Sequence, residues 1–66
     1  MNVAKVIEIS AESDVSFEAA IRNAIAKAAD TVHNIKGAWV KEQKVTVEND
    51  VIVKYRVDLK VTFVMD

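Results

Sequence analysis

The sequence predicts an α+β fold in which one helix covers one face of a three-stranded antiparallel sheet. Three observations predict it: an early β-rich run, a stretch with the period of an amphipathic helix, and a long final segment with a period of two. The chain has 66 residues, no proline and a single glycine. We therefore expect one domain, residues 1–66, built almost entirely of regular structure.

The first two elements are a short strand and an amphipathic helix. The strand is predicted at residues 3–9, and residues 10–15 are interpreted as a polar connection. Ser16 fits the N-cap, because its hydroxyl can accept a free amide of the first turn. The helix is expected to begin at Phe17 and to end near residue 33 or 34. Its apolar side chains recur at steps of three and four: Phe17, Ala20, Ile21, Ala24, Ile25, Ala28 and Val32.

The second half of the chain predicts a long hairpin. Residues 38–48 form the second strand, and Asn49 and Asp50 form a tight turn, because both residue types tolerate positive φ. Residues 51–65 form the third strand, in which apolar and mostly polar side chains alternate. The apolar set is Val51, Val53, Tyr55, Val57, Leu59, Val61, Phe63 and Met65.

The order of the strands follows from the connections. A helix between the first two strands makes them parallel to each other, whereas a tight turn makes the third antiparallel to the second. Placing the third strand between the other two, in the order 1-3-2, pairs every strand antiparallel and is the arrangement we predict.

The lengths of the elements predict a homo-oligomer. The third strand spans roughly 50 Å at about 3.3 Å per residue. The helix covers only about 25 Å at about 1.5 Å per residue. One helix cannot cover the whole apolar side of the hairpin, and an exposed apolar strip of this kind is typical of a protein–protein interface.

Composition excludes several classes of function. Nine Lys and Arg balance ten Asp and Glu, with both signs spread along the chain, so nucleic-acid binding is not expected. No apolar run is long enough to span a membrane, and no membrane partner is expected. The absence of cysteine excludes a disulfide and a thiolate metal cage, and is compatible with a cytoplasmic protein, which we expect.

The sequence does not predict an enzyme. His33 is the one histidine, and we interpret it as a helix-terminal residue favoured by the helix dipole. A single glycine cannot build a glycine-rich phosphate loop, and no serine lies in a nucleophile elbow. No catalytic residues are therefore assigned.

Two residues allow a structural and a functional interpretation. Trp39 begins the second strand and either fills a subunit interface, where tryptophan is enriched, or stacks on a planar ligand. Arg56 lies at a polar position in the third strand. It either pairs with a carboxylate from another strand or subunit, or its guanidinium holds a phosphate or a heterocycle carbonyl. The two interpretations stay open at this point for both residues.

The whole chain resembles the dodecin family. The strand–helix–strand–strand order carries the resemblance together with four segments: Val-Ala-Lys-Val-Ile-Glu-Ile, Ser-Phe-Glu-Ala-Ala-Ile, Val-Lys-Glu and Tyr-Arg-Val-Asp-Leu-Lys-Val-Thr-Phe. The resemblance implies a hollow homododecamer of βαββ subunits. Its flavin-binding members hold flavins in pairs between subunits, stacked on a tryptophan at the start of the second strand and contacted by a glutamine of the third.

The resemblance also implies a ligand site at Gly37, Trp39 and Arg56. The stacking tryptophan of the family falls on Gly37, and Trp39 lies two positions later, on the same strand face and about 7 Å further along. The family's glutamine falls on Arg56, which can only donate hydrogen bonds. The implied function is storage of a small planar ligand, with FMN, riboflavin or FAD as cofactor, in an altered pocket. The alternative is a structural or cation-binding shell, since dodecins with this Tyr-Arg pattern include a calcium-binding branch; its metal ligands are not assigned.

Overall fold

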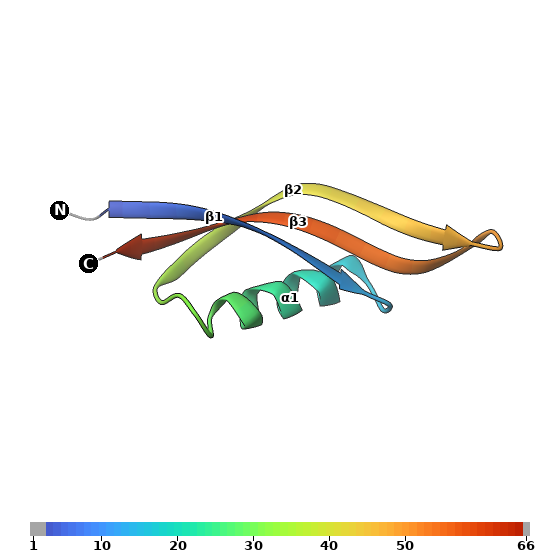
Figure 1. The fold of residues 1–66 in the computed structure, drawn as a ribbon, viewed down its shortest axis with the longest axis horizontal. Coiled ribbons are helices and arrows are strands. Elements are labelled where there is room, and N and C mark those ends of the chain that lie inside the picture. Colours follow the sequence, from blue (N-terminus) through green and yellow to red (C-terminus); the bar gives the residue numbers. More distant parts are fainter. Residues whose placement is uncertain (1–2, 66) are drawn as a thin grey trace.

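The computed structural model describes residues 3–65 and contains one sheet and one helix. The three strands pair antiparallel in the order β1-β3-β2, and α1 lies across one face of the sheet (Figure 1). This arrangement confirms the predicted fold class and strand order. The elements are β1 (Val3–Ser13), α1 (Phe17–Ala28), β2 (Ile35–Glu48) and β3 (Val51–Met65).

Strand β1 continues to Ser13, four residues beyond its predicted end at residue 9. The additional residues pair with β3, where the Ser10 hydroxyl donates a hydrogen bond to Asp58 and Glu12 forms an ion pair with Arg56. Serine and glutamate have weak preferences for strands, so the local sequence indicated a connection. Pairing with the long central strand outweighs that preference.

Helix α1 begins as predicted but ends early, at Ala28. The hydroxyl of Ser16 accepts a hydrogen bond from the amide of Ala19 at 3.0 Å, which confirms the N-cap. The predicted end near residue 33 or 34 is wrong. After Ala28 the chain forms turns, with the Thr31 hydroxyl donating to the Ala28 carbonyl at 3.2 Å, and Asn34 adopts a φ of 62°. His33 therefore lies in the connection to β2, and its interpretation as a helix-terminal residue is wrong.

Strand β2 begins at Ile35, three residues before its predicted start, and includes Gly37. The hairpin turn is as predicted: Asn49 and Asp50 have φ of 52° and 64°, the left-handed conformation that a tight turn of this kind requires. Three irregularities in the register, at Ile35/Gly37, Val40/Glu42 and Thr46/Val47, shift the pairing of β2 with β3.

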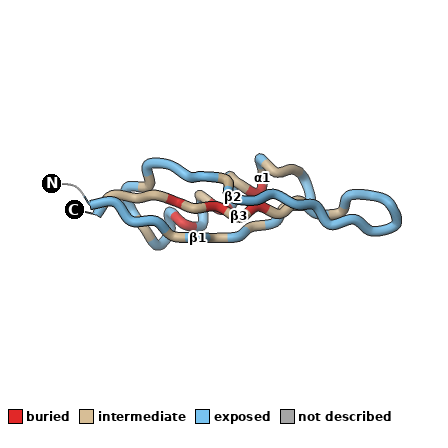
Figure 2. The backbone as a smooth tube through the Cα atoms, turned by 90° about the horizontal axis from the view of Figure 1, so that it is seen from above, coloured by how far each residue is buried: buried red, intermediate tan, exposed pale blue. Residues whose placement is uncertain are grey.

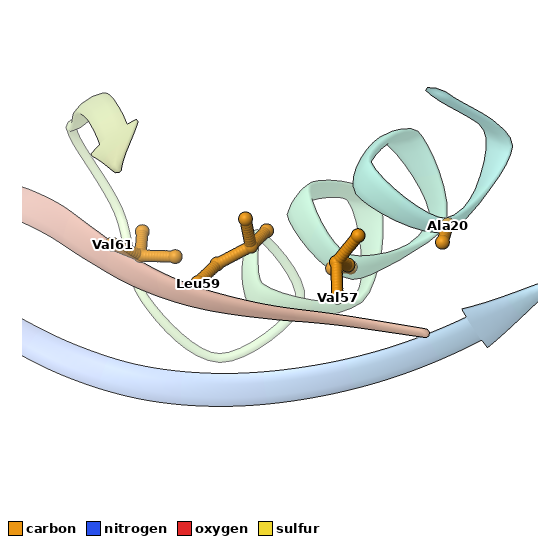
Figure 3. Close-up of a cluster of buried hydrophobic side chains, with 5 residues drawn as sticks. Ala20, Val57, Leu59 and Val61 are labelled. Atoms are coloured by element: carbon orange, nitrogen blue, oxygen red, sulfur yellow. The ribbon is translucent and has the colours of Figure 1, made fainter. Parts of the chain in front are cut away.

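The core lies between α1 and the middle of β3. Val57, Leu59 and Val61 project from the strand toward the helix, and Figure 3 shows them facing the side of α1 that carries Ala20. The small alanines at 20, 24 and 28 are buried and let the helix backbone approach the sheet closely. The alternation predicted for β3 is therefore correct in its central part, where the odd-numbered residues are fully buried.

The hairpin extends well beyond the helix. Figure 1 shows β2 and β3 projecting past the first turn of α1, and Figure 2 shows the end of the hairpin as exposed. The molecule measures 52 × 19 × 13 Å, and its radius of gyration of 13.6 Å exceeds the roughly 11 Å of a compact chain of this length. Within residues 3–65, no helix is long and apolar enough to cross a membrane.

Candidate functional site

The face of the sheet opposite α1, here called the outer face, carries the candidate site. From Arg56 to Thr62, each β3 residue on this face has one partner on β1 and one on β2, so side chains form rows across the three strands, about 7 Å apart. Three neighbouring rows carry charged or aromatic groups: Glu8–Lys60–Trp39, Ser10–Asp58–Glu42 and Glu12–Arg56–Lys44.

Trp39 is the exposed aromatic group of this face. Its relative exposure is 66%, which is high for the largest apolar side chain in the chain. The ammonium of Lys60 lies 5.5 Å from the centroid of the indole. Because β3 is the central strand and β2 an edge strand, Lys60 reaches the indole from the middle of the sheet. The indole thus has a cation on its inner side and open surface toward the edge.

Gly37 provides free space beside the indole. It pairs with Thr62 in the row next to that of Trp39, on the same face. A Cβ placed on Gly37 would meet no atom of residues 3–65 within 4 Å, apart from its own chain neighbours. The structure therefore places two of the three predicted site residues, Gly37 and Trp39, in neighbouring rows at one edge of the outer face, with open space beside Gly37.

Arg56 lies apart from these two residues. It is four positions from Lys60 along β3, about 13 Å at about 3.3 Å per residue. Its Nη1 donates to Oε1 of Glu12 at 3.0 Å, and Lys54 lies 3.6 Å from Oε2 of the same carboxylate. The structural interpretation of Arg56, an ion pair between strands, thus describes its contacts within the subunit.

A polar hollow of about 260 Å³ lies beside Arg56. Its lining alternates in charge, with an acidic row next to a basic one: Ser10, Glu42, Lys44, Arg56 and Asp58. Ser10 donates to Asp58, whereas Glu42 and Lys44 take part in no ion pair between residues 3 and 65. Over the same residues, no group of three carboxylate or histidine side chains is placed to hold a metal ion.

Sequence reasoning did not single out Lys60 or Glu12. The contact of Glu12 with Arg56 depends on the register between β1 and β3, which are far apart in sequence. The contact of Lys60 with Trp39 depends on the register of an irregular hairpin. The sequence position of Lys60 could have indicated its contact with Trp39, because counting outward from the turn at Asn49 and Asp50 pairs the two residues.

Comparison with known proteins identifies the family. The family model described as Dodecin matches residues 3–66, nearly the whole chain. The chain belongs to the dodecin family. Dodecins are non-catalytic proteins that bind small ligands, and the family binds flavins. The predicted resemblance and the expectation of a non-catalytic protein are confirmed on this basis.

Individual dodecins are similar over their full lengths. Calcium dodecin from Mycobacterium tuberculosis is 40% identical over 65 residues, which cover 98% of this chain and 92% of that protein. A crystal structure of the M. tuberculosis calcium dodecin, described as a calcium-chelating antigen with a novel calcium-binding site, has a TM-score of 0.83 and 39% identity, covering 97% of this chain and 91% of that one. The crystal structure of an arginine-to-alanine mutant of the T. thermophilus dodecin has a TM-score of 0.94 and 32% identity, and the match covers 100% of this chain and 98% of that one.

Proposed function

We propose that this dodecin stores a planar ligand of the flavin type, which stacks on Trp39 at the edge of the outer face. The observation that carries the proposal is the exposed indole, open toward the sheet edge and next to the unoccupied space at Gly37. An aromatic side chain of this size usually packs into a core or an interface, and a flat face left open is suited to offset stacking on another ring.

The proposed ring site consists of Trp39 and Gly37, completed by a second copy of the chain in a homododecamer. Dodecins are typically homododecameric, and the exposed hairpin described above supports assembly of this chain. Arg56 is about two rows from the indole and is paired with Glu12. Its contact with the ligand stays a prediction, and within one subunit it would involve a part of the ligand distant from the ring.

Flavin fluorescence tests this function. The purified protein is titrated with riboflavin, FMN and FAD, and stacking on tryptophan is expected to quench the flavin emission at micromolar concentrations. Because stacking of a heterocycle on an aromatic side chain contributes about 1–3 kcal/mol, Trp39→Leu should weaken binding by about 5- to 150-fold. Trp39→Phe, which keeps an aromatic face, is the matched control and should retain most of the affinity. Absence of quenching by the wild type excludes flavin.

A second candidate function is calcium binding by the assembled shell. The 40% identity to calcium dodecin favours it, as does the direct pairing of two carboxylates, Glu42 and Asp58, across β2 and β3. Like charges placed directly opposite destabilise a sheet, and a divalent cation would relieve that repulsion. Since one subunit brings no third carboxylate to them within residues 3–65, another subunit would have to complete the site.

The calcium function predicts a higher melting temperature with calcium than with a chelator. A ligand that binds only the folded state stabilises it in proportion to the logarithm of its concentration, so the difference should grow with calcium. Glu42→Gln should remove the difference, whereas Glu18→Gln, which alters a carboxylate on the exposed side of α1, should leave it unchanged. Identical melting of the wild type in calcium and in chelator rejects this candidate.

A further inference from the structure

Within the part of the chain that the structure describes, Lys60 is a cation without an anionic partner. Its neighbour in the row, Glu8, has its Oε2 3.2 Å from the ammonium of Lys41. None of the ion pairs among residues 3–65 involves Lys60, and its ammonium lies over the indole of Trp39, 5.5 Å from the ring centroid. The side chain is half-buried and therefore not simply a freely solvated surface lysine.

The charges around the indole do not cancel. One carboxylate, Glu8, faces two ammonium groups, Lys41 and Lys60, and it is paired with Lys41. The ammonium of a lysine has three donors, and the face of an aromatic ring satisfies it less well than an anionic oxygen does. The edge of the outer face therefore presents a stacking surface together with an uncommitted positive charge.

We infer that Lys60 makes this site selective for planar ligands that carry a phosphate, so that FMN binds more tightly than riboflavin. The inference rests on the proposed function. A flavin ring stacked on the open side of the indole lies about 3.5 Å from it. The ammonium lies 5.5 Å from the indole centroid on the inner side, which places ring plane and ammonium about 9 Å apart.

The chemistry of FMN fits this separation. About seven bonds join the flavin ring to the phosphorus, and an extended chain advances about 1.2 Å per bond, so the phosphate can reach the ammonium past the edge of the indole. A phosphate monoester carries about −1.5 to −2 charges at neutral pH, whereas the ribityl chain of riboflavin ends in a neutral hydroxyl. The two ligands share the ring and differ at the group that Lys60 would contact.

The other cations of the outer face are less suited to this role. Arg56 and Lys54 share the carboxylate of Glu12 and lie about two and three rows from the indole. Lys44 takes part in no ion pair within residues 3–65, but it lies in the row of Arg56, about 14 Å from the row of Trp39 at about 7 Å per row. Lys54 is the matched control for Lys60, because it belongs to the same strand and the same face and is about 20 Å away, at about 3.3 Å per residue.

The test compares dissociation constants of riboflavin and FMN, measured by fluorescence for the wild type, Lys60→Gln, Lys60→Arg and Lys54→Gln. We expect the wild type to bind FMN about tenfold more tightly, the low end for a hydrogen bond between charged groups. Lys60→Gln should bring the ratio of the riboflavin and FMN dissociation constants near one, while the dissociation constant of riboflavin changes by no more than about twofold. Added salt should likewise reduce the preference for FMN, because it screens the charges. Lys60→Arg and Lys54→Gln should keep the preference.

The outcomes separate this inference from the function on which it rests. Equal affinity of the wild type for both flavins, or an unchanged preference in Lys60→Gln, overturns the role of Lys60 and leaves flavin storage standing. If Lys54→Gln loses the preference for FMN as fully as Lys60→Gln does, the preference comes from the overall charge of the protein. This result also overturns the role of Lys60. If the wild type quenches neither flavin, the storage function fails and the selectivity fails with it. Far-UV circular dichroism of each variant verifies that the fold is intact.

Discussion

Gly37 occupies a position whose backbone does not require glycine. Its φ is not positive, although the pairing of β2 with β3 has an irregularity between Ile35 and Gly37. Glycine in a strand interior costs roughly 0.5–1 kcal/mol relative to alanine, because it loses more conformational freedom on folding. Since nothing within residues 3–65 approaches its missing Cβ, packing within this part of the subunit does not require glycine here.

Replacing Gly37 with alanine should stabilise the protein by about 0.4–1 kcal/mol, through the smaller entropy of the unfolded chain. Denaturant unfolding at one fixed protein concentration measures this, because the concentration of an oligomer affects its apparent stability. The neighbouring Ala38→Gly is the matched control and should lose a similar amount. Destabilisation by Gly37→Ala would instead indicate that a neighbouring chain packs closely against this backbone.

At the scale of elements, the parts decided by local chemistry were predictable and the rest were not. The start of α1 depends on the hydroxyl of Ser16, and the hairpin turn depends on two residues, Asn49 and Asp50, that tolerate positive φ. Both signals lie in a few adjacent residues. The end of α1 and the second half of β1 depend on contacts with β3 or on turns that have no strong local signature, and both were mispredicted.

The candidate site divides in the same way. Trp39 and Gly37 could be selected from the sequence because the chain has one of each. Counting from the hairpin turn also pairs Trp39 with Lys60, since the irregularities at Val40/Glu42 and Thr46/Val47 compensate each other by that point. Between the irregularities the same count is wrong by one residue, so the pairing of Lys44 with Arg56 could not be deduced. Glu12, which pairs with Arg56, lies in a segment that was expected to be a connection.

At the scale of the whole molecule, the single subunit leaves too much apolar surface exposed. Its accessible surface is 4869 Å², compared with about 4,200 Å² for a compact chain of this mass. The end of the hairpin, here called the hairpin tip, is apolar on both faces of the sheet and exposed: Val45, Val47, Val51 and Ile52. A flat apolar hairpin exposed in this way associates with other chains, and a closed assembly is the arrangement that avoids open-ended association.

The hairpin tip therefore predicts the effect of a charge placed on it. Val51 is 61% exposed in the single subunit, so Val51→Glu should not disturb the fold of the subunit, whereas an unpaired carboxylate buried between subunits costs several kcal/mol. Light scattering coupled to gel filtration should give a particle several times the 7.3 kDa chain mass for the wild type and for the conservative control Val51→Ile. Val51→Glu should give a much smaller particle with unchanged far-UV circular dichroism. A wild-type particle of a single folded chain would contradict the assembly, and with it any ligand site shared between subunits.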